Sequence, residues 1–530
     1  MLFFTELPMI ERVPSRYTEQ WARANVKVYT WALHSKEGTP EHTFALFWEL
    51  LLHKLLLRKS PRTRGKGRGP KDTLDARFQA FELGDYQLLV RGLVRACHVA
   101  KLRKRPFQAN DENRIQRRVE SLLAKGRFTK AFRLLDSQGQ GNMRDQGVVD
   151  QLNIKHGPRM FPLPGRLPQG LPDKAKLDYD VFHQGYRELK PLSGQGPDGY
   201  RYEYLSCLAT SMACPVAKQA IPCHREFAEL FINAELPAWY YYIACATKMI
   251  ALIKSPPKTE GGTPDVRPIG MGGCKRRAWT TCLMKVNADV FKNTFWPVQV
   301  AVGVKAGVPI QIYAVSEHMR NNKDHALMKL DFTNAFNTVW RRAVLKSCYD
   351  NPDMRHLYRF FWCTLSPKSI IVGIDNLSEE GMQQGDPAGP VGFCSPLKQH
   401  AEWAHAQLQE VGGMAVFDMD DGYLLGPIEK LLSVVKEFQR RLKTEVGAIL
   451  NPSKCEIWCH SQYRSHVREV LGQGQREGAE FVMGEMRCKD GRKTYGVKVN
   501  GVPFGDRAYV QEKMREKVSK VVSELNTENN

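Results

Sequence analysis

Apolar residues recur at spacings of three and four between residues 428 and 446, a pattern typical of an amphipathic helix. The residues of this stripe are Ile428, Leu431, Leu432, Val435, Phe438, Leu442 and Val446. Pro427 stands at the expected first turn and Gly447 just beyond the last, where such residues commonly begin and end helices. A helix with one continuous apolar face must pack on another element, and we expect that element to be a sheet.

Shorter apolar runs around this helix predict the strands of that sheet. Residues 326–330 form a short buried run that ends at Asp331. Residues 414–417 and 423–425 are β-like runs, and together they predict a hairpin whose acidic tip comprises Asp418, Met419, Asp420, Asp421 and Gly422. Residues 455–458 supply a further strand. The order strand, helix, hairpin, helix, strand favours an α+β fold with a small antiparallel sheet backed by helices on one face.

The first 175 residues predict a mainly helical, basic region that ends at a Pro- and Gly-rich stretch. The run from Arg58 to Lys71 is rich in Gly and Pro and almost uniformly cationic, which predicts a mobile loop. That loop serves either as a solvated linker or as a nucleic-acid contact. A second cluster, Lys101 to Arg105, continues toward Arg114, Arg117 and Arg118 on a predicted helix. Two such clusters favour a grip on RNA or DNA.

The charge balance also indicates a polyanionic partner. The 77 Lys and Arg residues outnumber the 56 Asp and Glu residues, which leaves a formal charge of +21. Charge alone does not distinguish nucleic acid from an anionic membrane. However, no run of eighteen apolar residues exists, and the stretch 47–57 is interrupted by Glu49, His53 and Lys54, so it predicts a core helix. The N-terminus lacks a secretory signal pattern, and we expect an intracellular protein of the nucleus or the cytoplasm.

The thirteen cysteines favour reduced, packed thiols over a disulfide framework, because they form no Cys-x-x-Cys pair and their number is odd. Cys455, Cys459 and His460 are close enough in sequence to suggest a zinc site. A second pair of ligands is missing there. Packed thiols beside a strand are therefore the favoured interpretation.

Three carboxylates carry the main chemical signal. Asp331 ends one predicted strand, and Asp420 and Asp421 stand at the tip of the predicted hairpin of the same sheet. Carboxylates that converge repel one another unless divalent cations lie between them. The acidic tip by itself is better explained by a solvated turn, since Asp and Gly are ordinary turn residues.

Four segments together resemble a known family. They are the stretch through Met328–Val339, the stretch Gly381–Pro390, the stretch Phe417–Gly426 and the stretch Leu450–Glu456, and their order and spacing resemble the palm motifs of reverse transcriptases, most of all those of non-LTR retrotransposons. The resemblance extends upstream through Gly194–Leu205 and Asp265–Gly270 and downstream to Asn500–Asp506. It implies fingers and palm at residues 176–460, after the helical region 1–175, and a primer-grip region with an incomplete thumb at residues 461–530.

The resemblance implies a role for each matching residue. Asp331 and Asp420 would be the main metal ligands, assisted by Asp421 and by the backbone carbonyl of Phe332, and the cofactor would be two Mg²⁺ ions, with Mn²⁺ as an alternative. Phe336 matches the bulky position that excludes a nucleotide 2′-hydroxyl in this family, although core packing alone would also explain it.

Further residues match positions that bind substrate. Gln384 and Gly385 would lie along the template and the incoming nucleotide, in a loop where Asp386 and Pro387 also suit the start of a helix. Lys454 matches a lysine proposed to protonate the departing pyrophosphate. Arg267 and Lys254 match basic residues that hold the triphosphate. The run Lys275–Arg277 is expected to add template contacts.

The resemblance implies an RNA-directed DNA polymerase whose partners are an RNA template, a DNA primer or nicked target DNA, and deoxynucleotides. No membrane partner is expected, and the sequence does not indicate the oligomeric state. The chain departs from the family at Asp418 and Met419, where an aromatic and a small residue usually precede the paired aspartates. This departure keeps open a decayed or domesticated palm that only binds nucleic acid. An RNA-dependent RNA polymerase is a third hypothesis. Phe336 disfavours it, because the matching position excludes a nucleotide 2′-hydroxyl.

Overall fold

The structure is a computed structural model, and it describes residues 2–59, 72–102, 112–124, 126–135, 139–210, 215–257, 259, 261–476, 481–488 and 491–527. The chain forms two compact units, and each unit is discontinuous in sequence. Unit 1 comprises Met1–Val286 and Arg355–Gly389, and unit 2 comprises Asn287–Met354 and Pro390–Asn530. These units divide the chain by compactness. The boundaries near residues 175 and 460 divide it by function and stay predictions.

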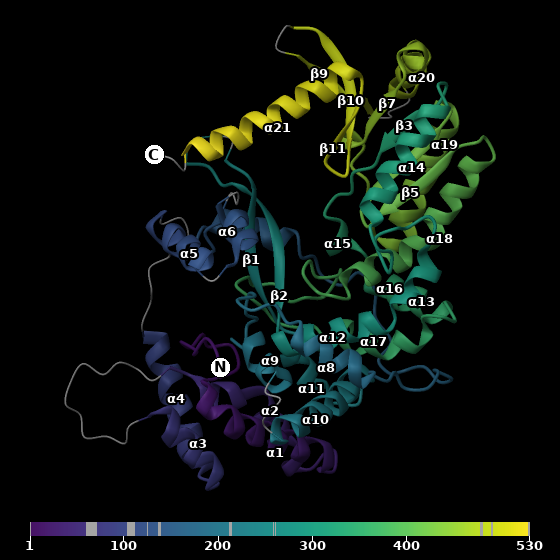
Figure 1. Ribbon diagram of the computed structural model, residues 1–530. Coiled ribbons are helices and arrows are strands. Elements are labelled where there is room, and N and C mark those ends of the chain that lie inside the picture. The colour runs from purple at the N-terminus through teal and green to yellow at the C-terminus, as the bar shows by residue number, and fades with distance from the viewer. Residues whose placement is uncertain are drawn as a thin grey trace. The chain divides into compact units, whose positions relative to one another are not determined.

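Unit 1 is mainly helical. Its helices are α1 (Thr18–His34), α2 (Pro40–Leu57), α3 (Leu74–Glu82), α4 (Tyr86–Leu102), α5 (Glu112–Ala124), α6 (Phe128–Leu135), α7 (Gln146–Ile154), α8 (Tyr179–Arg187), α9 (Tyr202–Thr210), α10 (Pro215–Ile232), α11 (Ala238–Ala244), α12 (Cys274–Val286) and α17 (Tyr358–Leu365). Helix α1 packs against α2 and α10 at the lower end of the view in Figure 1. The helical nature expected for the N-terminal region is confirmed.

Helix α2 contains the apolar stretch 47–57 that the sequence predicts to be a core helix, and this prediction is confirmed because the polar residues that interrupt the stretch, Glu49, His53 and Lys54, are buried. The carboxylate of Glu49 accepts hydrogen bonds from the hydroxyls of Tyr29 (2.9 Å) and Tyr240 (2.7 Å). Lys54 donates to three backbone carbonyls near the N-terminus, those of residues 2, 3 and 5. Each buried charge thus has partners that replace water.

The predicted cationic loop from Arg58 to Lys71 lies largely outside the described residues. Its first residue is not solvated, because the Arg58 side chain is 1% exposed and donates to Asp72 at 3.0 Å. Residues 103–105 of the second cluster also lie outside the described residues, and of its neighbours Arg117 is exposed on α5.

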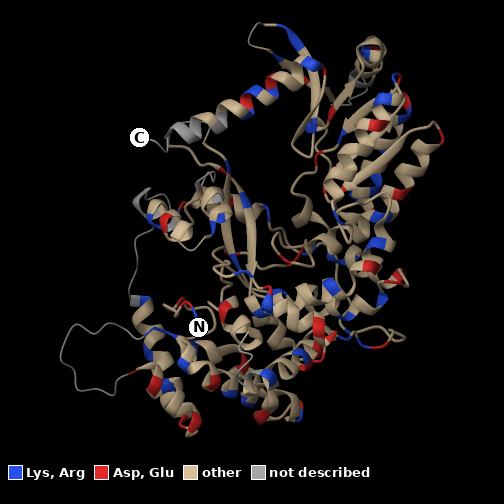
Figure 2. Cartoon of the chain, in the orientation of Figure 1, with Lys and Arg blue, Asp and Glu red and all other residues tan. Residues whose placement is uncertain are grey.

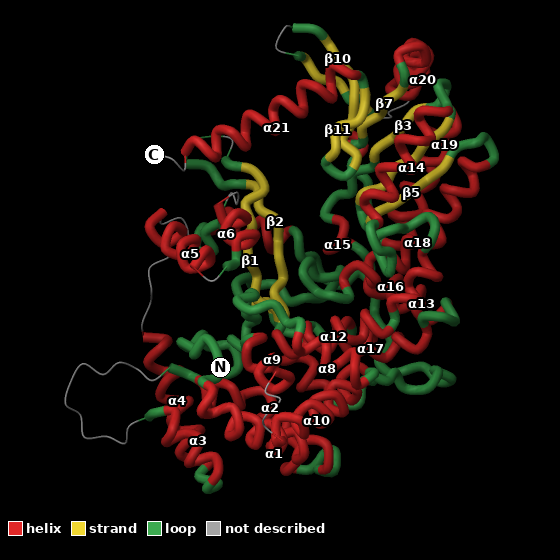
Figure 3. The backbone as a smooth tube through the Cα atoms, viewed as in Figure 1, coloured by secondary structure: helices red, strands yellow, loops and turns green. Residues whose placement is uncertain are grey.

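A three-stranded sheet of order β2-β1-β4 completes unit 1. Its strands are β1 (Thr247–Ser255), β2 (Asp265–Gly272) and β4 (Ile371–Val372). Strands β1 and β2 form a long antiparallel ribbon, drawn in yellow in Figure 3. Pro268 lies within β2, a position that is tolerated because β2 is an edge strand and needs no hydrogen bond from that nitrogen.

Unit 2 combines helices with two sheets. Its helices are α13 (Ala288–Phe295), α14 (Gly307–Asn321), α15 (Ala335–Thr338), α16 (Arg341–Asp350), α18 (Gly389–Gln409, entering from unit 1), α19 (Ile428–Arg441), α20 (Arg464–Arg476) and α21 (Arg507–Thr527). Its strands are β3 (Ala326–Lys329), β5 (Met414–Asp418), β6 (Asp421–Gly426), β7 (Glu456–Cys459), β8 (Val482–Met483), β9 (Glu485–Arg487), β10 (Lys493–Val499) and β11 (Val502–Gly505). The larger sheet has the order β5-β6-β3-β7-β8, and the smaller has the order β11-β10-β9.

The strands predicted from the apolar runs are therefore present, and β5, β6, β3 and β7 pair antiparallel as predicted. Helix α19 also follows the prediction. It begins after Pro427, and a π-helical turn over Leu442–Val446 leads to Gly447 in the left-handed conformation. Its buried face differs in one detail, because Val434 is buried whereas Leu432 is half-buried. The α+β class is confirmed.

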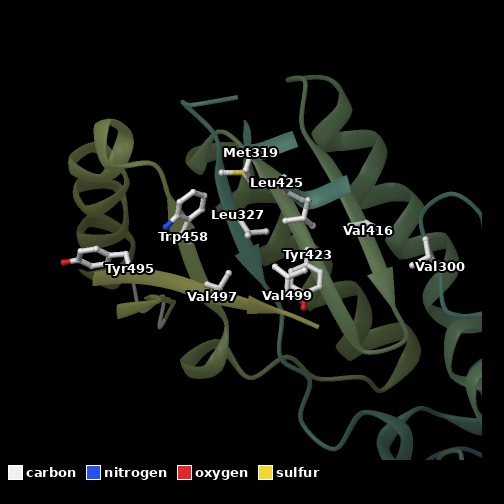
Figure 4. Packing of buried hydrophobic residues seen from close by; sticks show 11 residues of the cluster. Val300, Met319, Leu327, Val416, Tyr423, Leu425, Trp458, Tyr495, Val497 and Val499 are labelled. Atoms are coloured by element: carbon white, nitrogen blue, oxygen red, sulfur yellow. The ribbon is translucent and has the colours of Figure 1, made fainter. Parts of the chain in front are cut away.

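The larger sheet is covered on both faces, whereas the sequence led us to expect helices on one face. On one side Phe417 packs against Phe438 of α19. On the other side Leu327, Leu425 and Tyr423 form a core with Val315 and with strand β10 (Figure 4). The second cover arises from α14 and the β10–β11 hairpin, which lie before and far after the sheet in sequence.

None of the helices in the described part of the chain is both long and apolar enough to cross a membrane. All cysteines of the described residues are free thiols, and most of them are buried. Figure 2 shows basic and acidic positions interspersed over the helices of both units rather than gathered on one element.

Candidate functional site

The acidic residues of the larger sheet form a row across three strand ends in unit 2. We call β5, β6 and the turn between them the acidic hairpin (residues 414–426). Its register pairs Asp418 directly with Asp421. Strand β6 pairs in turn with β3, and Leu330 N donates to Gly422 O at 2.9 Å, so Asp331 follows at the level of Asp421. Directly opposite residues of antiparallel strands share a face, which places Asp418, Asp421 and Asp331 on one side of the sheet.

The charges of this row act on one another. Partial removal from water raises the pKa of the Asp421 carboxyl, the Lys329 ammonium lowers it, and the charge of Asp331 raises it. Partial removal from water, followed by the charges of Asp421 and Asp420, raises the pKa of the Asp418 carboxyl. Both shifts mean that the ionised row is electrostatically unfavourable without a cation.

Asp420 occupies the turn beside the row. The turn contains only Met419 and Asp420, whereas the sequence predicted a tip of five residues. The shorter turn places Asp418 and Asp421 in the strands themselves. Asp420 raises the pKa of the Asp418 carboxyl and, after burial, that of the Cys394 thiol, so its charge lies near both groups.

The backbone of the turn is strained and held in place by a side chain. Met419 adopts φ of 55°, a left-handed conformation that is costly for a residue with a side chain. The buried amide of Gln299 accepts from Met419 N at 2.9 Å and donates to Met419 O at 3.3 Å. Gln299 also belongs to a short parallel bridge with Phe417 of β5. This segment therefore fixes the conformation from which Asp420 projects.

The chain after Asp331 is held by the segment that precedes β7. Asn451 N donates to Asp331 O at 2.8 Å, and Asp331 N donates to the Cys455 thiol at 3.4 Å. Phe332 and Leu450 form an antiparallel β-bridge, in which the residues on either side of them make the hydrogen bonds. The Phe332 carbonyl therefore points away from Leu450. Because these contacts tie the two segments together, the turn Pro452–Lys454, in which Ser453 and Lys454 are exposed, lies beside the end of β3.

Phe336 lies on the short helix α15 and is 9% exposed. Its ring stacks on Phe393 of α18, with centroids 4.8 Å apart and planes at 18°. Phe332 meets the same ring edge-on at 6.2 Å. The packing explains why an aromatic residue is suited to this position and leaves the proposed exclusion of ribonucleotides as a prediction.

The substrate-binding candidates Arg267 and Lys254 lie in unit 1, on the β1–β2 ribbon, and both are exposed. Arg267 pairs with Leu252 in the antiparallel register. Lys254 falls in the irregularity between Ile253 and Ser255, where the register shifts by one residue. The two cations are thus neighbours near one end of the ribbon, available to an anionic ligand.

Gln384 and Gly385 also lie in unit 1, in the loop before α18. The carbonyl of Gln384 accepts from Gly270 N of β2 at 3.1 Å. Gly385 has φ of 101°, and a Cβ atom there would lie 3.2 Å from Gly270 O. Glycine is favoured here by its positive φ, and the close approach of strand β2 leaves little room for a side chain. The expected approach of a base or sugar at this glycine stays a prediction. Asp386 caps the turn that leads into α18, since its side chain accepts from Ala388 N at 3.0 Å.

The expectation that Lys275, Arg276 and Arg277 contact a template is wrong for this structure, because all three side chains are less than a tenth exposed. Lys275 binds the Glu49 carboxylate, and Arg276 binds the Asp386 carboxylate. Arg277 donates to the carbonyl oxygen of residue 194 at 2.5 Å. These cations stabilise unit 1 from inside. A run of three consecutive cations does not reveal this, because the partner carboxylates lie far away in sequence.

The donor atoms of the acidic row are oxygens of carboxylates and of one directed carbonyl, which is the chemistry that Mg²⁺ and Mn²⁺ prefer. The mutual repulsion of Asp421 and Asp331 is the electrostatic condition that a divalent cation relieves. Within the described ranges, however, no three His, Cys, Asp or Glu side chains lie close enough to hold a metal ion together. The side chains fit such an ion in kind and in position on the sheet, without forming a closed set of ligands. The suggested zinc ligands Cys455, Cys459 and His460 are likewise not grouped as a metal site among the described residues. The two thiols are buried, and the His460 ring contacts Met319 O at 2.7 Å.

Sequence reasoning missed three residues of this region. Lys329 stands two residue pairs from the acidic row on the same sheet face, opposite Tyr423, and contacts Glu456 at 3.8 Å. Gln299 and Gln311 both bind the backbone of the acidic hairpin. For Lys329 the signal available was a cation within an otherwise apolar strand. The two glutamines gave no local signal, because their partners are more than a hundred residues away in sequence.

Comparison with known proteins agrees with this geometry. Residues 256–503 match the family model described as reverse transcriptase (RNA-dependent DNA polymerase). This range contains the acidic row, the turn of Lys454 and the loop of Gln384. No curated protein matches the chain. The chain thus resembles reverse transcriptases over residues 256–503, which is a little under half of its length.

Proposed function

We propose that this protein is an RNA-directed DNA polymerase of a retroelement, of the non-LTR type, which extends a DNA primer or a nicked target end with deoxynucleotides. The observation that supports the proposal most is the row of Asp418, Asp421 and Asp331 on one face of the sheet, with Asp420 in the adjoining turn. The match to the reverse transcriptase family model supports the same conclusion.

In this proposal Asp331, Asp420, Asp421 and the Phe332 carbonyl would hold two Mg²⁺ ions, which would supply activation of the primer hydroxyl and stabilisation of charge on the leaving pyrophosphate. The chain's own residues orient the reactants. Gln299 binds the backbone of the turn of Asp420. Asp331 accepts a hydrogen bond from Asn451 N and donates one to the Cys455 thiol, so Lys454, which lies between these two residues in sequence, is close to the same strand end. A lysine there can donate a proton to the leaving group.

The test is primer extension by the full chain on poly(rA) primed with oligo(dT), with dTTP and Mg²⁺. We expect extension by the wild type and a loss of about 100-fold or more in the Asp420→Asn variant, whose thermal unfolding stays near that of the wild type. Asp324→Asn is the matched control, because Asp324 is an exposed carboxylate just before the other end of β3. Extension by Asp420→Asn at the wild-type rate would contradict the proposed role of Asp420.

A second function is a palm that binds nucleic acid without polymerising. The fourth carboxylate at Asp418 favours it, since it adds charge to the row, and so does the absence of a three-ligand metal group among the described residues. Both functions predict binding that weakens with salt. Salt-sensitive RNA binding by a wild-type protein that incorporates no nucleotide with Mg²⁺ or Mn²⁺ would establish this second function.

A further inference from the structure

The β10–β11 hairpin reaches the acidic hairpin through a short chain of polar side chains in unit 2. Its turn consists of Asn500 and Gly501, both with positive φ (48° and 78°), between Val499 and Val502, which pair in register. Such a two-residue turn is the one that Asn-Gly favours. Strand β10 packs through Val497 and Val499 on the same sheet face as the acidic row. Figure 4 shows Val499 beside Tyr423 of β6.

Asn500 makes two contacts with this face. Its backbone nitrogen donates to the Tyr423 hydroxyl at 2.8 Å, and its side-chain amide donates to the Oε1 atom of Gln311. The Tyr423 hydroxyl in turn donates to Lys498 O at 3.4 Å. Tyr423 follows Asp421 by two residues on the same strand and points to the same face, so the turn of the β10–β11 hairpin contacts the strand two residue pairs from the acidic row.

Gln311 links Asn500 to the backbone of the acidic hairpin. Its side chain is fully buried, and its Nε2 atom donates both to Val416 O (3.2 Å) and to Asp421 O (3.0 Å). Val416 lies on β5 and Asp421 on β6, so one amide binds both strands. A Gln amide has two donor hydrogens and one acceptor oxygen, and these three contacts use both hydrogens and the oxygen.

The two carbonyls fix the orientation of the Gln311 amide, because only its nitrogen can bind them. Its oxygen must then face Asn500, and the group at residue 500 must donate. Asn meets this requirement, and an ionised Asp of the same shape does not. We infer that Asn500 and Gln311 are positioning residues, which set the β10–β11 hairpin in register with the carboxylates of the acidic row.

This inference rests on the proposed function for its consequence in catalysis. The relay is the pair of hydrogen bonds that runs from Asn500 through Gln311 to Asp421. If the β10–β11 hairpin holds the primer end, as the resemblance of residues 500–506 implies, this relay aligns the primer hydroxyl with the carboxylates. Loss of the relay then lowers kcat, because alignment matters in the chemical step, and leaves the binding of primer and nucleotide nearly unchanged.

The test compares Asn500→Asp with Asn500→Gly. If residue 500 serves only the turn, both variants behave as the wild type, because Asp tolerates a left-handed turn position and Gly favours it. If the relay holds, Asp is worse than Gly, since its carboxylate faces the Gln311 oxygen whereas Gly leaves room for water. We expect kcat to fall about tenfold in Asn500→Asp and less in Asn500→Gly, with KM for dTTP within about twofold of the wild type.

Two measurements keep the inference separate from the proposed function. Hydrogen exchange of residues 414–426 reports the link without any activity, and we expect about tenfold faster exchange in Asn500→Asp than in the wild type. In a Gln311→Leu background the Asn500→Asp change should have almost no further effect on exchange, because its partner is gone. Asn321→Asp, an exposed change on the same helix α14, is the control.

The outcomes are distinct. A wild type that extends no primer defeats the proposed function, while the exchange data still decide whether Asn500 holds the acidic hairpin. Exchange in Asn500→Asp equal to that of the wild type, or equal effects of Asp and Gly on kcat, overturns the inference.

Discussion

The ring of Phe336 stacks on that of Phe393, 4.8 Å away and nearly parallel to it. The contact separates two roles for Phe336, packing and selection of the nucleotide sugar. Phe336→Ala and Phe393→Ala both remove an aromatic ring from the same stack, and each should lower the free energy of unfolding by about 3 kcal/mol. Only Phe336→Ala should raise incorporation of ribonucleotides relative to deoxynucleotides, measured as the ratio of kcat/KM values.

The Phe393→Ala variant is the control for this experiment. Equal ribonucleotide incorporation by the two variants would reduce Phe336 to a packing residue. Efficient incorporation of ribonucleotides by the wild type would instead favour an RNA-dependent RNA polymerase.

Gly447 ends the helix that packs under the acidic hairpin. Its φ is 83°, and a Cβ atom there would lie 2.4 Å from the ring of Trp340. Gly447→Ala should therefore lower the free energy of unfolding by more than about 2 kcal/mol, from backbone strain and overpacking together. Gly412→Ala is the matched control, because Gly412 has φ of 70° with open space around it, and it should cost about 1 kcal/mol. Urea unfolding measures both, and equal losses would exclude a role for Trp340.

Lys275 and Glu49 form a buried ion pair in unit 1. Lys275→Met should destabilise the protein by about 3 kcal/mol or more, because the Glu49 carboxylate keeps its burial and loses its cation. The change should leave the salt dependence of RNA binding unaltered, since a buried lysine contacts no phosphate. Chemical unfolding and binding at several salt concentrations measure the two effects. A shallower salt dependence in Lys275→Met would show that Lys275 contacts a phosphate of the template, contrary to its burial in the structure.

His224 predicts a pH dependence of stability. Burial, followed by the charge of Lys275, lowers the pKa of His224 to about 3. Neutral His224 donates from Nε2 to Asn25 Oδ1 at 3.0 Å and contacts the Tyr186 hydroxyl through Nδ1 at 3.3 Å. In the unfolded chain a histidine takes up its proton near pH 6.5. The stability that the neutral imidazole gives is therefore complete above about pH 6.5 and is lost as the pH falls toward 3.

The measurement is the free energy of unfolding between pH 7 and pH 4. His224→Gln should reduce its slope by up to one proton, about 1.4 kcal/mol per pH unit. His98→Gln, a change at an exposed position of α4, is the control and should leave the slope as it is. An unchanged slope in His224→Gln would show that His224 is protonated in the folded protein.

Local patterns in the sequence predicted the elements that carry the acidic row. The spacing of apolar residues predicted α19, and the alternation around Asp420 predicted the acidic hairpin. The length of its turn was not predictable in this way, because the register of β5 and β6 sets it. Strands that continue to Asp418 and from Asp421 leave Met419 in a left-handed conformation, which its side chain disfavours and Gln299 compensates.

The partners of charged and polar residues were the least predictable feature. Lys275, Arg276 and Arg277 have the composition of a surface patch, yet Glu49 and Asp386 bury two of them through contacts between distant segments. Gln311 likewise shows its role only beside Asp421 and Asn500. The partners of such side chains are close in space but distant in sequence. The periodicity of helices and strands therefore does not reveal them.

Each unit consists of two separate segments of the chain, and this arrangement affects synthesis and proteolysis. Strand β4 pairs with β1, and the two are separated in sequence by the first segment of unit 2. A ribosome must therefore synthesise β3 and α16 before unit 1 can acquire its third strand, and no single cut releases either unit intact. Expression of residues 1–286 alone should leave an edge of β1 open to pairing with other chains, which favours aggregation.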